Sequence, residues 1–445
     1  MGQTMRRSLP ILLGLGLVAP LAFADATTSE TAPASGDAID LTPAPSEPPG
    51  WALRPVPRVE VDDGETWLLA RRHNALVYAS RSLRHGRGLV RRGTALAGTP
   101  ASRNEACDGR WFRVEPGGYV CTAAGFRALP ADPPSETPDA APATDAPLPY
   151  AYAMVTDREA FRYEYLPSRR LRERVQGGAN LPDIAEQLNG DYFVAVAGEE
   201  EHHDETWLRT VTGDYVRAAA VERIEGSALA GVHDADGIEL PLAFVYADDV
   251  RVTDASGTTR GVPKYARFGV VSVEGDTVVG AEVRAPRDGV RLVQQVPRPA
   301  DVPEGARWIH VDLDEQTIVA YEGDTPIFAS LVASGKEGYD TPAGTFRIRH
   351  KYVSITMRGE DPHDGVYDVA EVPWTMYYDG SYALHGAYWH DGFGNVRSHG
   401  CTNIAPADAR FLFTWSTPRL PEGWHGVRAD GTYVHLTRAP DDDEA

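Results

Sequence analysis

Alternating apolar and polar positions dominate the last third of the chain and predict β-strands. Residues 308–313 alternate, a turn-forming Asp-Glu-Gln follows, and residues 317–321 continue as a second strand. Apolar residues at helical spacing occur at 406–415, where a proline occupies the first turn. This region is therefore predicted to be a β-meander with one buried face, one helix and a last strand at 433–436.

An internal repeat marks the first half of the chain. Residues 111–121 and 207–217 share Trp, Arg, Gly, Tyr and Val at identical offsets, in an order that suits a strand, a glycine-containing turn and a second strand. Two copies imply two related β-modules, at about 51–129 and 150–226. Strand-like runs indicate a possible third module at 240–298, which lacks the repeated signature.

Proline-rich segments separate these units. Residues 25–50 and 130–149 contain many prolines and acids but no lysine or arginine, so both are expected to be extended linkers. Residues 438–445 form an acidic tail. The predicted fold class is mainly β, with a C-terminal domain at 306–437 preceded by two or three small modules.

The first 24 residues have the features of a secretory signal peptide. Arg6 and Arg7 precede a short apolar run, and Ala22 to Ala24 offer the small residues that a signal peptidase requires. The run is too short to span a bilayer comfortably, so an uncleaved anchor is the less favoured alternative. We expect a periplasmic or cell-wall location, with no stable membrane insertion after cleavage.

Length and charge narrow the function classes. A chain of 445 residues suggests two to four domains. The 43 basic and 64 acidic residues give a formal net charge of −21, which predicts a soluble, self-repelling protein. No nucleic-acid partner is expected, because polyanion binding needs clustered lysine and arginine, which the acidic chain as a whole lacks.

Three cysteines are informative because an exported protein meets an oxidising environment. Cys107 and Cys121 lie 14 residues apart and are predicted to form a disulfide. Such a bridge would stabilise the first module by about 3 kcal/mol in the chain-entropy model. Cys401 is then left as the odd thiol, so thiol titration of the native protein should find one reactive sulfur.

The odd thiol stands in the most informative segment, which reads Leu-His-Gly at 384–386 and Ser-His-Gly-Cys-Thr-Asn at 398–403. A cysteine nucleophile needs a base, a rigid position and backbone N–H groups that face a developing oxyanion. His385 ends a predicted strand upstream of Cys401, and Gly400 permits unusual backbone dihedrals. A nearby imidazole would raise the thiolate fraction at neutral pH.

These motifs make residues 306–437 similar to the L,D-transpeptidase (YkuD) catalytic domain of bacterial cell-wall enzymes. The resemblance covers about 30% of the chain. It rests on Val311-Asp312-Leu313 with Gln316, Ser334-Gly335-Lys336, the segment 341–346, His385-Gly386, and Ser398-His399-Gly400-Cys401-x-Asn403. Thr402 follows the cysteine, where the family usually has an apolar residue. The N-terminal modules resemble small bacterial SH3-like barrels.

The resemblance implies a β-sandwich-like catalytic fold, no cofactor or metal, and acyl transfer on peptidoglycan stem peptides. Cys401 would be the nucleophile, His385 the general base and later acid, and the Gly386 carbonyl would orient the imidazole. The site would be shaped by Ser398, His399 and Asn403, with backbone N–H groups of Gly400 and Cys401 as oxyanion donors. Loss of D-alanine would leave a thioester, and the amine of another stem would then form a 3→3 cross-link. Carbapenem-type β-lactams are the implied inhibitors.

Two further features are expected near the site. Aromatic and apolar residues between 374 and 389 are mostly core, but Met376, Tyr388 and Trp389 are expected to line the substrate groove. Residues 351–372 are long and polar and contain glycine and proline, which suits a flap over the site.

Several alternatives stay open. Four potential zinc ligands lie close together in the sequence, although their spacing fits no zinc motif: His385, His390, His399 and Cys401. A buried structural Cys401 is a further alternative, whereas a papain-like protease fits poorly because its cysteine precedes its histidine. Water as the acyl acceptor would make the protein a carboxypeptidase, and a protein lysine would make it an attachment enzyme. A non-catalytic scaffold that binds the wall through the modules is the alternative from another class.

Overall fold

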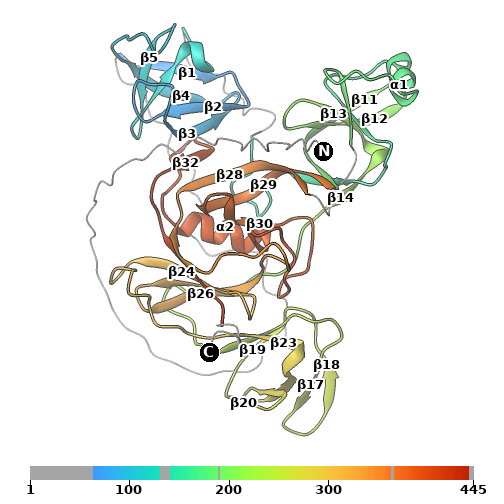
Figure 1. Ribbon diagram of the computed structural model, residues 1–445, viewed down its shortest axis with the longest axis vertical. Coiled ribbons are helices and arrows are strands. Elements are labelled where there is room, and N and C mark those ends of the chain that lie inside the picture. The colour runs from blue at the N-terminus through green and yellow to red at the C-terminus, as the bar shows by residue number, and fades with distance from the viewer. Residues whose placement is uncertain (1–63, 131–140, 189–190, 362–364, 440–445) are drawn as a thin grey trace, which may run out of the picture.

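The computed structural model describes residues 64–130, 141–188, 191–361 and 365–439. The expected signal peptide and the 25–50 linker lie outside these residues. Strands make up most of the regular structure, which confirms the predicted mainly β fold class. Figure 1 shows a C-terminal domain with three smaller β-bodies around it, two at one end and one at the other. In the described part of the chain, no helix is long and apolar enough to cross a membrane.

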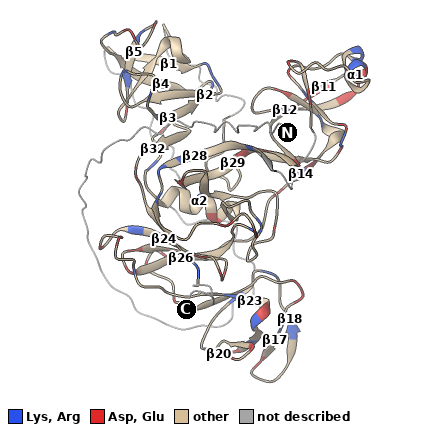
Figure 2. Ribbon diagram, in the orientation of Figure 1, with Lys and Arg blue, Asp and Glu red and all other residues tan. Residues whose placement is uncertain are grey.

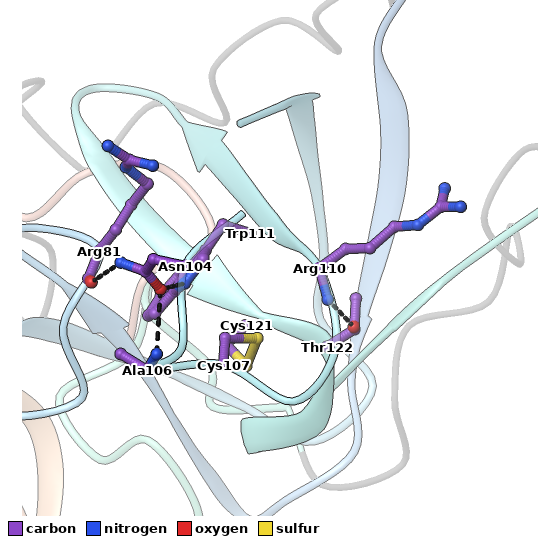
Figure 3. Close-up of a disulfide and its surroundings, with 8 residues drawn as sticks. All are labelled: Arg81, Asn104, Ala106, Cys107, Arg110, Trp111, Cys121 and Thr122. Atoms are coloured by element: carbon purple, nitrogen blue, oxygen red, sulfur yellow. Dashed lines mark hydrogen bonds between the residues drawn. A yellow bond between two sulfur atoms is a disulfide. The ribbon is translucent and has the colours of Figure 1, made fainter. Parts of the chain in front are cut away.

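The first module (residues 64–130) consists of seven short strands around its own apolar core. They are β1 (Thr66–Ala70), β2 (Asn74–Tyr78), β3 (Gly86–Arg91), β4 (Ala95–Pro100), β5 (Trp111–Val114), β6 (Gly118–Cys121) and β7 (Phe126–Ala128). The predicted disulfide between Cys107 and Cys121 is present. Figure 3 shows it beside Trp111, whose indole N–H donates to Asn104 Oδ1 at 2.7 Å.

The second module (residues 141–226) repeats the hairpin of the first. Its elements are β8 (Ala151–Val155), β9 (Phe161–Tyr163), α1 (Arg169–Gln176), β10 (Ala185–Gln187), β11 (Asp191–His202), β12 (Glu205–Thr210), β13 (Tyr215–Arg217) and β14 (Val221–Ile224). Trp207 pairs with Arg217 here as Trp111 pairs with Cys121 in the first module. A single 3₁₀ turn follows each hairpin. The repeated residues thus occupy equivalent places in two hairpins.

The third module (residues 242–293) contains two small sheets with a core of their own. One sheet has the order β19 (Arg267–Gly269), β16 (Leu242–Val245), β23 (Val290–Val293). The other has the order β18 (Thr259–Gly261), β17 (Arg251–Asp254), β22 (Val283–Pro286), β21 (Thr277–Val279), β20 (Ser272–Glu274). A 3₁₀ turn precedes the last strand, as it does in the other two modules.

The C-terminal domain contains the predicted meander and helix. Its elements are β24 (Arg307–Asp312), β25 (Thr317–Glu322), β26 (Thr325–Ala333), β27 (Gly344–Arg347), β28 (His350–Asp361), β29 (Gly365–Asp379), β30 (Tyr382–Gly386), β31 (Thr402–Ile404), α2 (Pro406–Trp415), β32 (Gly426–Arg428) and β33 (Tyr433–Thr437). The segment expected to be a flap is the long hairpin β28–β29. The last strand β33 runs parallel to β24 and antiparallel to β27.

Helix α2 is fixed in the middle of this domain. Its apolar side chains, including Leu412 and Phe413, belong to the main core. Lys351 of β28 is 1% exposed, and its Nζ donates to the carbonyl oxygens of Phe413 (2.5 Å) and Ser416 (2.8 Å) at the end of the helix. A side-chain donor at a helix C-terminus satisfies carbonyls that have no partner within the helix. Because α2 follows β31 directly, this anchoring also fixes the strand that follows Cys401.

Strand pairing joins the first module, the second module and the segment just before the third module to the C-terminal domain. β3 of the first module pairs with β32, and Trp424 of the C-terminal domain enters the core of the first module. At Gly88 of β3 a Cβ atom would lie 2.4 Å from the Gly426 carbonyl, so only glycine allows this close approach. β11 of the second module runs parallel to β29, and β15 (Val232–His233), just before the third module, pairs with β26.

Candidate active site

Two short parallel strands bring the predicted catalytic segments together. β30 pairs with β31 so that His385 lies opposite Asn403, and β31 also pairs with β26. Cys401 immediately precedes β31. Side chains alternate along a strand, so residues two apart share a face. Cys401 and Asn403 therefore lie on the same face as His385, with Cys401 one diagonal step from it.

Cys401 is a free, half-buried cysteine. Its Sγ donates to the carbonyl oxygen of Ser381 at 3.5 Å. Burial raises the pKa of the Cys401 thiol to about 11, although the backbone N–H of Ala383 favours the thiolate. The sulfur is therefore protonated at neutral pH.

His385 is 2% exposed, and its Nδ1–H donates to the carbonyl oxygen of Gly386 at 3.3 Å. This bond leaves Nε2 as the unprotonated nitrogen of the neutral ring. Burial lowers the pKa of His385 to about 4. Among the described residues no hydrogen bond joins His385 to Cys401, so the two neutral side chains are bonded to other groups.

The turn before Cys401 is closed by Ser398. Its hydroxyl donates to the Cys401 carbonyl and accepts from the Gly400 N–H at 3.0 Å. Gly400 has φ +113°, and a Cβ atom there would lie 2.7 Å from the Tyr382 ring. Because Ser398 already occupies the Gly400 N–H, that group would have to leave Ser398 before it could serve as an oxyanion donor.

His399 and Asn403 contact different parts of the domain. His399 is exposed, stacks on Tyr367 of the β28–β29 hairpin at 5.7 Å, and meets Tyr339 edge-on at 4.8 Å. The Asn403 amide lies 2.9 Å from His390 Nε2. Within the described ranges, no group of three or more His, Cys, Asp or Glu side chains gathers to hold a metal.

Two of the three residues expected to line the groove are instead buried. Met376 is 0% exposed in the main core, where its sulfur accepts from the Ser416 hydroxyl, because alternate residues of β29 face α2. Tyr388 is 1% exposed, and its hydroxyl donates to the Ala370 carbonyl at 2.6 Å. Trp389 is half-buried, with its ring 5.7 Å from the His385 ring.

Residues of the second module also reach this aromatic group, and sequence reasoning missed them. Tyr152 stacks on Tyr388 with ring centroids 3.9 Å apart, and Phe193 meets Trp389 at 6.1 Å. Phe193 therefore contacts the residue that borders His385. Residue types alone do not indicate this contact, because apolar strand residues are normally assigned to a module's own core.

Glu371 of β29 connects the catalytic domain with the first and second modules. Sequence reasoning also missed this residue. It is 2% exposed; its carboxylate accepts from the Arg91 guanidinium and lies 3.3 Å from His73, both of the first module. The Tyr152 hydroxyl of the second module donates to its carbonyl oxygen at 2.7 Å. Burial alone would raise the pKa of Glu371, but the Arg91 charge and the His73 hydrogen bond lower it to about 2. The carboxylate is ionised.

Comparison with known proteins identifies the domain that holds this site. Residues 306–441 match the family model of the L,D-transpeptidase catalytic domain (YkuD). This part of the chain, about a third of its length, therefore carries an L,D-transpeptidase catalytic domain. A search of curated proteins found no match.

Solved L,D-transpeptidase structures are similar to the chain over this region. A mutant of the Enterococcus faecium L,D-transpeptidase is 24% identical, over 33% of this chain and 55% of that one, with a TM-score of 0.25. The E. faecium catalytic domain acylated by ertapenem is 25% identical, over 30% and 99%, with a TM-score of 0.25. An L,D-transpeptidase from Mycobacterium smegmatis is 19% identical, over 45% and 93%, with a TM-score of 0.25. The chain thus spans about half the length of the first of these proteins.

Proposed function

We propose that the protein is an exported cysteine acyltransferase that forms 3→3 cross-links between peptidoglycan stem peptides. Cys401 attacks the carbonyl that joins the third residue of a donor stem to its terminal D-alanine. His385 takes the thiol proton through Nε2 and passes it to the leaving D-alanine nitrogen, which leaves a thioester on Cys401. The side-chain amine of a second stem then attacks the thioester, and its proton returns the thiol to the neutral form.

The observation that carries this proposal is the shared face of Cys401 and His385 on paired parallel strands. Strands in a sheet lie about 4.8 Å apart and rise about 3.3 Å per residue, so diagonal neighbours have Cα atoms about 8 Å apart. A thiol and an imidazole can bridge such a separation once χ1 of Cys401 turns the sulfur from Ser381 toward the ring. The Gly386 carbonyl supports the required tautomer, because it holds the proton on Nδ1.

The N-terminal segment and the modules support a location at the cell wall. We propose that residues 1–24 are a cleaved signal peptide, that the protein is periplasmic or wall-associated, and that the first two modules are SH3-like. Carbapenem-type compounds are proposed inhibitors, in line with the ertapenem-acylated relative.

The proposal is tested by incubating the protein with purified disaccharide-tetrapeptide and determining product masses. A dimer with loss of one D-alanine supports cross-linking, and a tripeptide alone would show that water is the acceptor. Cys401→Ala should abolish every product, whereas Cys107→Ala/Cys121→Ala, which removes sulfurs remote from the site, should retain the reaction. Activity in Cys401→Ala would remove Cys401 from the role of nucleophile.

A further inference from the structure

The first module is basic, although the protein is acidic. Residues 64–130 contain eleven arginines, no lysine and four acidic residues, against a chain total of 43 basic and 64 acidic residues. The homologous hairpin module at 141–226 contains nine arginines and sixteen acidic residues. The chain-wide charge that argued against a polyanion partner therefore averages over modules of opposite sign. Figure 2 shows basic segments around the strands of the first module.

The arginines of the two modules differ in their partners. In the second module six arginines form ion pairs with carboxylates: Arg162, Arg169, Arg172, Arg209, Arg217 and Arg223. In the first module eight exposed arginines have no ion pair among the residues that the structure describes: Arg71, Arg72, Arg84, Arg87, Arg92, Arg103, Arg110 and Arg127. Eight guanidinium groups thus remain available to an external anion.

Four of these arginines gather at one end of the module. Arg71 and Arg72 form the turn after β1, and Arg92 lies in the turn after β3. The two turns are tied by hydrogen bonds between Ala70 and residues 93 and 94, and the Arg71 N–H donates to the Gly125 carbonyl at 2.8 Å. Arg127 follows on β7, opposite Leu69 of β1. The same end supplies His73 and Arg91 to the buried Glu371, so it adjoins the β28–β29 hairpin.

We propose that this end of the first module is a binding surface for the peptide-bearing wall polymer, with Arg71, Arg72, Arg92 and Arg127 pairing with stem-peptide carboxylates. This assignment of the partner rests on the proposed function. Guanidinium groups bind carboxylates through two parallel hydrogen bonds. Exposed arginines spread over several turns suit a polymer with repeated charges better than one small anion. Strand pairing with β32 holds this surface next to the catalytic domain, so bound polymer is kept close to the site.

Two other polyanions fit the surface less well. Membrane surfaces are bound by basic patches that also insert apolar side chains, and the exposed large apolar residues of the described module are Leu76 and Leu83, neither of which lies in these turns. Single-stranded nucleic acids need exposed aromatic rings for base stacking. In the described part of this module no aromatic side chain is fully exposed: Tyr78, Trp111, Phe112 and Phe126 are buried, and Trp67 and Tyr119 are half-buried. A carboxylate polymer needs neither feature.

The test measures binding of the full chain carrying Cys401→Ala to purified sacculi over a range of salt concentrations. Arg71→Gln/Arg72→Gln/Arg92→Gln should weaken binding by about tenfold or more at low salt and flatten its salt dependence. Arg158→Gln/Arg170→Gln/Arg174→Gln, which removes three exposed arginines from the second module, is the matched control and should bind like the parent. Sacculi with amidated carboxylates should bind the parent as weakly as untreated sacculi bind the first triple variant.

Equal binding by the two triple variants would overturn the proposal, as would undiminished binding to amidated sacculi. Binding to phosphatidylglycerol vesicles that is as tight as sacculus binding, and is lost in the same variant, would assign the surface to lipid phosphate instead. When Cys401 is left intact, both triple variants should turn over soluble disaccharide-tetrapeptide at the same rate. A loss of turnover confined to the first triple variant would also contradict the proposal. Binding is measured with the inactive Cys401→Ala protein. The binding result can therefore be interpreted even if the proposed reaction is wrong.

Discussion

At the residue scale, the proposed nucleophile and the proposed base are both neutral, and each is hydrogen-bonded to a backbone carbonyl. The thiol of Cys401 donates to Ser381, while the His385 ring is oriented by the Gly386 carbonyl. Burial raises the pKa of Cys401 to about 11 and lowers that of His385 to about 4. A thiolate–imidazolium pair would require the opposite shifts. Proton transfer is therefore expected to accompany attack on the substrate rather than precede it.

This arrangement predicts how alkylation of Cys401 depends on pH. The thiolate is the reactive form, and below the thiol pKa its fraction rises tenfold per pH unit. The rate of iodoacetamide modification of the native protein should therefore keep rising from pH 7 to about 10. The urea-unfolded protein, with its disulfide intact, is the control and should level off above about pH 9. A plateau of the native rate at neutral pH would show a preformed ion pair.

The candidate site could be proposed from the sequence because its signal is local. Cys401, His385, Gly386 and Gly400 stand in two short motifs, and strand pairing brings these segments together. Met376 was wrongly assigned to the groove because sequence alternation does not show which face of β29 meets α2. Glu371 gave no signal, since its partner Arg91 lies 280 residues away.

At the element scale, the β28–β29 hairpin is the part of the catalytic domain that the first and second modules contact. β11 extends its sheet, the first module binds Glu371, and Tyr367 stacks on His399, which lies two residues before Cys401. The sequence predicted a flap here because the segment is polar and contains turn-forming residues. Polar residues within it instead form buried contacts between domains, which a single-chain pattern cannot distinguish from solvent exposure.

Replacing Glu371 with glutamine should weaken the contact between the first module and the β28–β29 hairpin. The change leaves the Arg91 guanidinium buried without a counter-charge, which costs about 3 kcal/mol or more. Glu115→Gln removes the carboxylate of an exposed ion pair with Arg113, and should cost less than about 1 kcal/mol. Urea denaturation followed by tryptophan fluorescence compares the two. Equal stability of both variants would show that the buried pair does not hold the first module in place.

The Glu371 carboxylate also predicts that the folded protein loses stability in acid. The pKa of Glu371 is about 2 in the folded protein, against an ordinary value of 4.5 for a glutamate carboxyl. A lowered pKa stabilises the folded state fully above pH 4.5, and this contribution is lost as the pH falls from 4.5 to 2. Between those values the wild type should therefore lose more stability than Glu371→Gln, which has no proton to bind there. Urea denaturation at pH 6 and pH 3 measures the difference, and parallel losses would contradict it.

At the scale of the whole molecule, the modules and the catalytic domain share cores. Leu229, Phe244, Val293 and Val302 pack with Trp308 and Tyr321 in one buried cluster. The sequence indicated separable modules joined by linkers, since composition marks where a linker runs but not where a module docks. Strand pairing between units depends on backbone groups, which leave no mark on residue type.

Two fragments test this sharing. A fragment that begins at residue 306 loses four large apolar side chains from the cluster, each worth about 1.5–3 kcal/mol when buried. A fragment that begins at residue 226 retains them. Both fragments lack the first two modules, so the comparison isolates the third. The longer fragment should unfold at a much higher temperature than the shorter one, as measured by scanning calorimetry with light scattering. Similar melting of both fragments would show that the third module is only tethered.

The most direct measurement is the mass of the protein after brief incubation with disaccharide-tetrapeptide and acid quenching. An acyl-enzyme should appear with the mass of the donor minus D-alanine, and peptide mapping should place it on the peptide that contains Cys401. Hydroxylamine should release it, as expected for a thioester. Turnover without any adduct on that peptide, or an adduct on another residue, would contradict the account.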